Sequence, residues 1–377
     1  MNKITLTEKS KVAASLLERI RELHNPEERV RFMEVCGTHT VAIFREGIRQ
    51  MLPKGIELIS GPGCPVCVTD QQYMDQALAY AAQDDVVIAT FGDMLKVPGT
   101  TGNLWQSKEE GAHIEIIYSP MEVLSLSEQY PDKKIIFLGI GFETTIAVIA
   151  ATIQAVHAKG LKNVFFLISH KLVPPALRAL LSNPDHQIDG FLLPGHVSVI
   201  IGEQPYQFLA DEYHMPSCIA GFDGVEILAA IVNLLEQRKE KKFYVGNTYR
   251  SVVAKTGNPV AQQLMDTLYE PSDDGWRGIG TLPASGLKLR GEWSAYDALV
   301  QLPLPPFTTS DGPKGCQCGS VIQGMIHPDA CPLFLPPLFG KLCTPEHPVG
   351  ACMVSVEGSC SAWYKYGFSS GGMTWEE

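Results

Sequence analysis

Two cysteines lie in one tight turn, the sequence Gly-Pro-Gly-Cys-Pro-Val-Cys at residues 61–67. Thiols separated by two residues can form a disulfide or bind one metal ion, and the positive end of a helix favours the reactive thiolate. An apolar run precedes the turn and a helical pattern follows Asp70, so we expect Cys64 and Cys67 between a strand and a helix. Two small buried residues are the alternative interpretation. A redox or metal role is favoured.

Cys36 repeats this placement, because it follows an expected strand at 30–35 and precedes another helical pattern. His39 lies three residues later and could hydrogen-bond the thiolate or share a ligand. A cysteine near a histidine is often only structural, but a thiol at a strand-to-helix turn favours function. We therefore treat Cys36 and His39, with the Cys64/Cys67 pair, as candidate catalytic residues.

The remaining candidate thiols gather near the C-terminal end. Six of the ten cysteines lie beyond residue 315, an unusual density if the protein is cytosolic, where structural disulfides are rare. They lack the paired Cys-x-x-Cys knuckles usual in structural zinc sites, whereas single thiolates on separate loops suit a cuboidal iron–sulfur cluster, which needs four cysteines. Zinc or scattered thiols remain alternatives. The six are Cys316, Cys318, Cys331, Cys343, Cys352 and Cys360.

Alternating apolar strands and helical patterns must position these residues. Four strands with intervening helices occur before about residue 122 and a second round follows it, so we expect an α/β fold with two doubly wound, parallel-sheet domains. Ligands of such sheets bind outside the carboxyl ends of the strands. Polar residues follow several expected strands and could line one cleft between two facing domains, together with the three cysteines above: Asp93, Glu143, His170 and His196.

The expected division of the chain follows from these patterns. Residues 1–29 form an amphipathic helix packing on the cysteine-rich tail, and 30–122 form the first α/β domain. The less regular segment 243–300 packs back on that domain, whereas 123–242 form the second. After a proline-rich linker, residues 301–377 complete the fold as a small cysteine-rich iron–sulfur domain.

Composition excludes several classes of function. The 377-residue chain is 45% hydrophobic with a formal charge of −11 and no basic stripe, which argues against nucleic-acid binding. Its apolar runs are far shorter than a membrane span, and its N-terminus lacks a signal pattern, so we expect a cytoplasmic protein without membrane partners. The Gly139-x-Gly141-x-x-Thr144 run lacks the third glycine of a dinucleotide site and the acidic residue expected after the next strand.

Several motifs together resemble the hydrogenase maturation family HypD over essentially the whole chain. One local departure is an apparent insertion at residues 335–340, which lengthens a loop between two cysteines without removing one. The matching stretches are Cys36–Thr40, Gly61–Cys67, Gly139–Thr145, Pro194–Val197, Cys331–Phe334, Cys343–Pro345 and Gly350–Cys360.

The resemblance implies a scaffold on which the Fe(CN)2CO unit of [NiFe]-hydrogenase is assembled with a HypC-type chaperone, with cyanide arriving from a HypE-type donor. It implies that Cys36 holds this transient iron unit and that Cys64 and Cys67 are a redox-active dithiol. His39 would then tune the iron ligand rather than replace it. A soft thiolate suits low-spin iron carrying cyanide and carbonyl.

The resemblance also implies a [4Fe-4S] cluster in the tail. Its ligands map to Cys318, Cys331, Cys343 and Cys360, with Cys316 and Cys352 as rivals. Two classes of function follow. The first, which we favour, is an assembly scaffold with a redox centre rather than a turnover enzyme. The second is a thiol–disulfide oxidoreductase supplied with electrons by the cluster.

Overall fold

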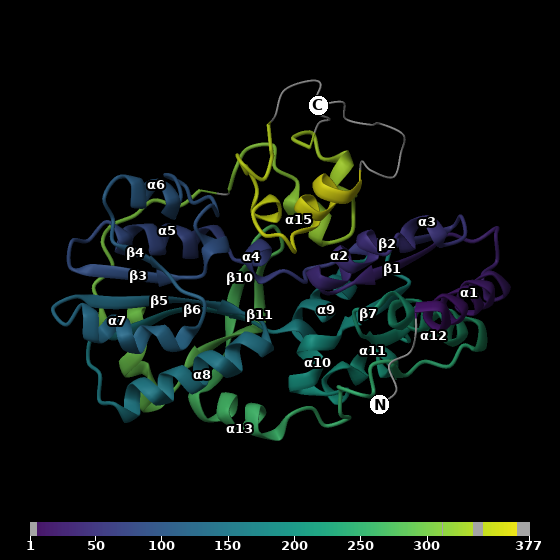
Figure 1. Cartoon of the computed structure of the whole chain (residues 1–377), viewed down its shortest axis with the longest axis horizontal. Helices are drawn as coiled ribbons and strands as arrows, with labels where there is room; N and C mark the ends of the chain where they lie inside the picture. Colours follow the sequence, from purple (N-terminus) through teal and green to yellow (C-terminus); the bar gives the residue numbers. More distant parts are fainter. Residues whose placement is uncertain (1–5, 311, 335–341, 368–377) are drawn as a thin grey trace.

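The computed structural model describes residues 6–310, 312–334 and 342–367, and Figure 1 shows its two sheets side by side. The apparent insertion at 335–340 lies outside the described residues. One sheet has the order β2-β1-β7-β8-β9, and all of its strands are parallel. Its strands are β1 (Val30–Glu34), β2 (Ile56–Ser60), β7 (Gly190–Pro194), β8 (Ser217–Ala220) and β9 (Val245–Asn247).

The second sheet has the order β10-β11-β6-β5-β3-β4. Four strands are parallel, and an antiparallel hairpin pairs with β6 through its second strand. The predicted α/β class and its two parallel-dominated sheets are confirmed. The strands are β3 (Val86–Thr90), β4 (Ile114–Ile116), β5 (Lys134–Gly141), β6 (Val164–Lys171), β10 (Tyr269–Trp276) and β11 (Gly280–Leu289).

Helices connect the strands and cover the sheets (Figure 1). Those around the first sheet are α1 (Leu6–Leu23), α2 (Gly37–Arg45), α3 (Ile48–Met51), α10 (Gly195–Ile201), α11 (Gln207–Asp211) and α12 (Gly224–Glu240). Two further helices, α4 (Pro65–Val68) and α9 (Val173–Ser182), contact β5 and β11 of the second sheet. Those associated with the second sheet or the following segment are α5 (Gln71–Ala81), α6 (Leu104–Glu109), α7 (Val123–Gln129), α8 (Glu143–Ala158), α13 (Pro259–Leu268) and α14 (Ala298–Gln301). Asp70 caps α5 by accepting from the Tyr73 amide at 2.8 Å, which explains where that helix begins.

The sheets divide the chain differently from the sequence-based prediction. β1 and β2 pair in the sheet that contains β7, β8 and β9, whereas β3 and β4 pair with β5 and β6. The segment 243–300 contributes β10 and β11 to this second sheet, next to β6. Each sheet thus draws strands from both predicted domains, because the β1–β7 pairing joins residues distant in sequence, and local patterns carry no information about such a partner.

The N-terminal helix also differs from its expected place. α1 packs along α12 rather than forming part of the cysteine-rich region. Arg19 pairs with Glu236 at 3.0 Å, and Lys9 pairs with Asp223. The apolar face of α1, including the fully buried Ile20, packs into the hydrophobic core that α12 forms with the strands of the first sheet.

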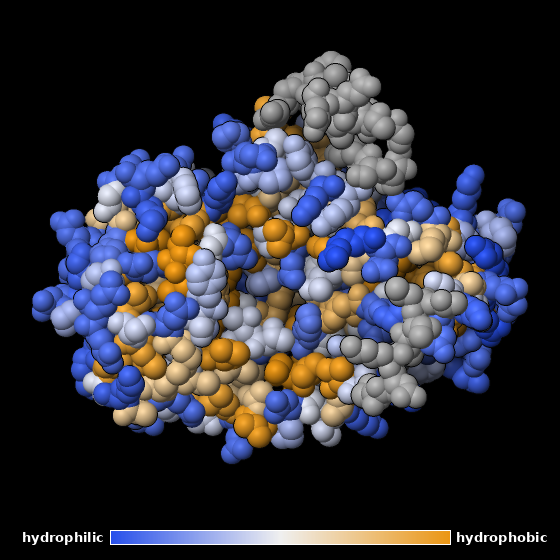
Figure 2. Space-filling view, viewed as in Figure 1, coloured by the Kyte–Doolittle hydropathy of each residue, from blue (hydrophilic) through white to orange (hydrophobic). Residues whose placement is uncertain are grey.

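The cysteine-rich tail lies over the junction of the two sheets (Figure 1). It contains short helices, α15 (Cys318–Ile322) and α16 (Ser359–Ala362), and the 3-10 turn η7 (Ala351–Met353). Its buried side chains belong to the same hydrophobic core as residues from both sheets. The face in Figure 2 is mostly polar at its two ends and shows more apolar side chains near its middle. In the described part of the chain, no helix is long and apolar enough to cross a membrane.

Candidate functional site

The turns that carry Cys36 and the cysteine pair are in direct contact. β1 and β2 are parallel neighbours, so both turns leave the same edge of the sheet. The Gly37 amide donates to the Gly63 carbonyl at 3.2 Å, and a Cβ on Gly63 would collide with the Cys36 backbone. A glycine at 63 therefore lets the turns touch. The expected proximity of Cys36 to this pair is confirmed.

Cys64 and Cys67 are joined by a disulfide, with their Cα atoms 5.2 Å apart. Cys64 is the N-cap of α4, and its sulfur accepts from the Cys67 amide at 3.3 Å. Pro65 begins this four-residue helix, a position where proline costs no hydrogen bond. Both cysteines are buried. The expected strand–turn–helix placement is thus present, with a helix of one turn directly after Cys64.

The Cys36 thiol differs from the thiolate that a strand-to-helix turn favours. Burial raises its pKa to about 11, although the Thr38 hydroxyl and the amides of Thr38 and His39 oppose the shift. The desolvation cost of a buried anion exceeds what the first turn of α2 returns. At neutral pH Cys36 is therefore a protonated thiol. Any metal bound there must displace that proton.

His39 is fully buried and makes its polar contacts away from the Cys36 sulfur. Its Nε2 lies 2.9 Å from the Gly221 carbonyl and 3.2 Å from the Ala220 carbonyl, so Nε2 carries the proton. Within the described residues its Nδ1 has no hydrogen-bond partner. Burial lowers the pKa of His39 to about 4, which keeps the imidazole neutral. The contact with Cys36 comes from its backbone amide.

Glu357 reaches this site from the tail, and sequence reasoning did not single it out. Its carboxylate accepts from the Thr38 hydroxyl at 2.7 Å. A Cβ on Gly37 would overlap the Glu357 backbone, so the tail packs tightly on the first turn of α2. Glu357 belongs to the tail stretch Gly350–Cys360, but no local pattern places it beside a turn more than three hundred residues earlier.

The four polar residues expected around one cleft separate into two groups. His196 stacks on Phe222 with ring centroids 4.0 Å apart, and His39 lies on the same ring at 4.7 Å. Loss of hydration raises the pKa of Asp93 and the Glu357 carboxylate adds to that shift, so Asp93 also faces this region.

Glu143 and His170 are buried in the interior. The Glu143 carboxylate accepts from the Val173 amide at 3.0 Å, and burial raises its pKa to about 7. The prediction for His170 is wrong. β6 continues to Lys171 and pairs with β11, so His170 is a mid-sheet residue in edge-to-face contact with Tyr269, with ring centroids 5.0 Å apart, rather than a side chain in an open cleft.

The six tail cysteines come together. Cys316 and Cys318 share a hydrogen bond with their sulfurs 3.2 Å apart. Hydrogen bonding to Cys318 raises the pKa of Cys360, and Cys352 interacts with both of these thiols. Burial raises the pKa of Cys343, and nearby Cys316 and Cys331 thiols add to the shift. Cys318, Cys331, Cys352 and Cys360 are buried.

We call the group of six tail cysteines the cysteine cradle, and Gly350 forms one wall of it. A Cβ there would lie 2.5 Å from the sulfurs of both Cys316 and Cys318. Across residues 6–310, 312–334 and 342–367, no group of three or more His, Cys, Asp or Glu side chains is arranged around a single metal ion. A cubane cluster makes a different demand, because each of four cysteines binds a separate iron. Convergent, buried thiols with a glycine wall fit such a group.

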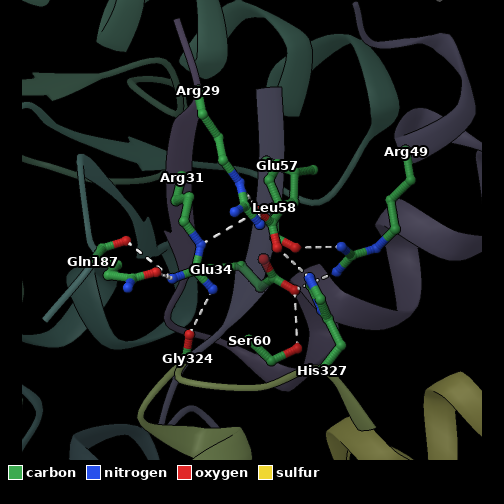
Figure 3. Close-up of polar contacts among 10 residues, drawn as sticks. All are labelled: Arg29, Arg31, Glu34, Arg49, Glu57, Leu58, Ser60, Gln187, Gly324 and His327. Atoms are coloured by element: carbon green, nitrogen blue, oxygen red, sulfur yellow. Dashed lines mark hydrogen bonds and ion pairs between the residues drawn. The ribbon is translucent and has the colours of Figure 1, made fainter. Parts of the chain in front are cut away.

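An ionic network attaches the tail to β1 and β2 (Figure 3). Arg31 donates to the Gly324 carbonyl at 2.8 Å and pairs with Glu57 at 3.3 Å. Glu57 also binds His327 of the tail and Arg29. Burial alone would raise the pKa of Glu57, but the hydrogen bonds from His327 and Arg29 lower it below its ordinary value. Glu57 therefore remains an anion between cations.

Arg49 extends this network into the interior (Figure 3). It pairs with the fully buried Glu34 at 2.8 Å, and Ser60 also donates to Glu34 at 3.1 Å. The guanidinium lies over Phe44 at 4.9 Å and over Trp363 of the tail at 5.5 Å. Burial raises the pKa of Glu34 to about 7, although Arg49 opposes the shift.

A family model and several known proteins each match nearly the whole chain, and they indicate the same family. The family model HypD, described as "Hydrogenase formation hypA family", matches residues 11–367. The hydrogenase maturation factor HypD of Escherichia coli (strain K12) is 42% identical over 357 residues, covering 93% of this chain and 94% of that protein. HypD2 of Bradyrhizobium diazoefficiens is 40% identical, with 94% of each chain covered. HypD of Rhodobacter capsulatus is 40% identical, with 90% of each covered.

Proposed function

We propose, from the premise that this chain belongs to the HypD family and acts in hydrogenase maturation, that it is the scaffold on which an Fe(CN)2CO unit is assembled. In this proposal Cys36 holds the iron through its sulfur. A HypC-type chaperone completes the scaffold, and a HypE-type protein delivers cyanide. The iron unit is cargo that leaves for a hydrogenase rather than a resident cofactor.

One observation carries the proposal: the contact between the Cys36 turn and the Cys64–Cys67 turn, with Glu357 of the tail beside them. A protonated, buried Cys36 is protected from oxidation and releases its proton when a soft metal binds. The disulfide on the adjacent turn can accept two electrons, and the dithiol formed by its reduction can donate them. Iron capture and a change of redox state can therefore occur within one small region.

The tail supplies the redox centre in this proposal. Cys318, Cys331, Cys343 and Cys360 would bind a [4Fe-4S] cluster, with Cys316 or Cys352 as possible replacements. The Cys316 and Cys318 sulfurs lie 3.2 Å apart and Cys318 also hydrogen-bonds Cys360, so these thiols must move apart for four of the cysteines to bind one cubane. Such a cluster carries one electron at a time, whereas reduction of the disulfide consumes two electrons and two protons. Two successive transfers from an external one-electron donor would balance the reaction.

The test is an infrared spectrum of the full-length protein purified anaerobically with its HypC-type partner. Cyanide and carbonyl stretching bands are expected in the wild type and absent from Cys36→Ala. Cys218→Ala is the matched control, because Cys218 is another buried free cysteine, on β8. Bands that survive in Cys36→Ala would overturn the assignment of the iron ligand.

A second candidate is a cluster-dependent thiol–disulfide oxidoreductase. The observation in its favour is that α4, with its disulfide, packs directly against η7 of the cysteine-rich tail. This function requires Cys64 and Cys67 but not Cys36. Turnover of disulfide substrates that persists in Cys36→Ala, with no iron–cyanide bands in the wild type, would favour it over the scaffold.

A further inference from the structure

Arg277 lies between the disulfide-bearing helix and the cysteine-rich tail. It occupies the turn of the β10–β11 hairpin, directly after the buried Trp276. Gly278 has a left-handed φ of +76°, which lets the turn reverse tightly at this point. This hairpin was not expected from the sequence, and neither proposed function uses Arg277.

On one side Arg277 holds the chain that leaves α4. Its backbone amide donates to the Val68 carbonyl at 2.9 Å, and its Nε donates to the Thr69 carbonyl at 2.7 Å. Its Nη1 donates to the Gln71 side-chain oxygen at 2.9 Å. The remaining bonds, from Nη2, reach the Asp70 and Pro98 carbonyls at 3.4 Å. These acceptors are neutral oxygens, and the Asp70 carboxylate acts on the guanidinium electrostatically.

On the other side the same turn contacts the cysteine cradle. The guanidinium lines one cavity together with Cys316 and Cys318. A Cβ on Gly278 would collide with Gly319, next to Cys318, and Gln323 of the tail donates to the Gly278 carbonyl at 2.8 Å. Burial lowers the pKa of Arg277, while Cys318 opposes the shift electrostatically. A positive charge thus lies close to the tail thiols.

We infer that Arg277 is a positioning residue that fixes the disulfide turn against the cysteine cradle and places a positive charge between the two redox groups. The part of this inference that concerns the cysteine cradle rests on the proposed cluster. A nearby positive charge stabilises the reduced cluster, which is its more negative form, and it stabilises the reduced cysteine pair whenever one of the two thiols is ionised. Arg277 therefore makes both groups easier to reduce.

The test is a pair of anaerobic redox titrations on the full-length protein. One follows the cluster spectroscopically, and the other follows the state of Cys64 and Cys67 by mass mapping in thiol–disulfide buffers. In Arg277→Gln we expect the cluster's reduction equilibrium to shift about tenfold toward the oxidised form, equivalent to about 59 mV for one electron. The cysteine pair should shift in the same direction. Arg277→Lys keeps the charge, so its cluster equilibrium should lie close to that of the wild type.

Arg290→Gln is the matched control, because this exposed arginine follows the other end of the same hairpin; both equilibria should remain as in the wild type. Wild-type cluster and cysteine potentials in Arg277→Gln would overturn the inference. Equal cluster shifts in the Gln and Lys variants would overturn the role of the charge. A wild-type protein without an iron–sulfur chromophore would instead overturn the proposed cluster. In that case, an unchanged equilibrium of the cysteine pair in Arg277→Gln would independently overturn the role of Arg277.

Discussion

The two cysteine regions of this protein are held in place in different ways. Cys36 and the Cys64–Cys67 turn follow parallel strands, so backbone pairing between β1 and β2 fixes their positions. The tail has little regular structure, and its helices α15 and α16 span only five and four residues. Apolar packing against the sheets, thiol–thiol contacts, an ionic network and the hairpin turn at Arg277 hold it instead. The region of Cys36 and the Cys64–Cys67 turn should therefore keep its structure without metal, whereas the tail should not.

The largest expected effect is loss of the tail cluster. Alanine at Cys318, Cys331, Cys343 or Cys360 should abolish the brown chromophore of the anaerobically purified protein, because a cubane needs four thiolates. The free energy of metal binding stabilises the folded form of such a region. In these variants, hydrogen exchange should therefore accelerate in the tail while β1 and β2 keep their protection.

Cys316→Ala and Cys352→Ala are the internal controls for this prediction, because both thiols touch the same cradle. A chromophore that survives Cys318→Ala but not Cys316→Ala would correct the ligand set. Zinc in place of iron would contradict the cluster. Equal acceleration of exchange in the tail and in β1 would contradict the contrast between the two regions.

Cys36→Ala should produce the complementary result. Hydrogenase maturation should be eliminated, while the tail chromophore and the thermal transition of the sheets remain as in the wild type. The reason is that Cys36 lies after β1 and contributes no pairing to either sheet. The measurement combines hydrogenase activity in a complemented strain with the visible spectrum of the purified variant. Loss of the tail chromophore in this variant would show that the two regions fold together.

His39→Ala should weaken maturation without eliminating it. The buried imidazole fixes the loop after β8 through the Gly221 carbonyl and packs against the Phe222 ring, so its loss loosens the surroundings of Cys36 without removing the Cys36 sulfur. Residues that orient a ligand are typically worth about 10–100-fold in affinity or activity. The intensity of the iron–cyanide bands per protein measures the effect. Complete loss in His39→Ala, with bands retained in Cys36→Ala, would reverse the two roles.

The same contrast explains what the sequence could predict. Strand-to-helix turns are local patterns, so the placement of Cys36, Cys64 and Cys67 was predictable, and parallel pairing brought the turns together. The partners of β1 are not local: β7 lies more than a hundred residues away, and the predicted domain division missed it. The neutral state of Cys36 was missed for a related reason, because burial depends on the packing of Glu357 and other distant residues.

A smaller effect is expected where the tail meets the sheet. Arg49→Gln leaves the fully buried Glu34 without its charged partner and removes the cation lying over Trp363. We expect a loss of about 2–3 kcal/mol in the free energy of unfolding, below the usual cost for a broken buried pair because Glu34 can become protonated. Urea unfolding at pH 7 measures it. Arg29→Gln is the control: Arg29 is 70% exposed, so its pair with Glu57 should cost less than about 1 kcal/mol.

A pH-dependent effect separates the two carboxylates of this junction by its sign. Burial raises the folded-state pKa of Glu34 from 4.5 to about 7, so its contribution is fully present below pH 4.5 and is lost as pH rises toward 7. Glu34→Gln should remove this slope, and its stability relative to the wild type should rise by about 1 kcal/mol per pH unit in that window.

The pH dependence of the Glu57 contribution has the opposite sign. His327 and Arg29 lower the pKa of Glu57 against the effect of burial, so its contribution is present at neutral pH and lost on acidification. Urea unfolding of Glu34→Gln from pH 4.5 to 7, and of Glu57→Gln from pH 7 to below pH 4.5, checks both signs. Parallel slopes would show that the tail and the sheet respond as one electrostatic unit, because the carboxylate buried in the sheet and the one bound to the tail would then titrate alike.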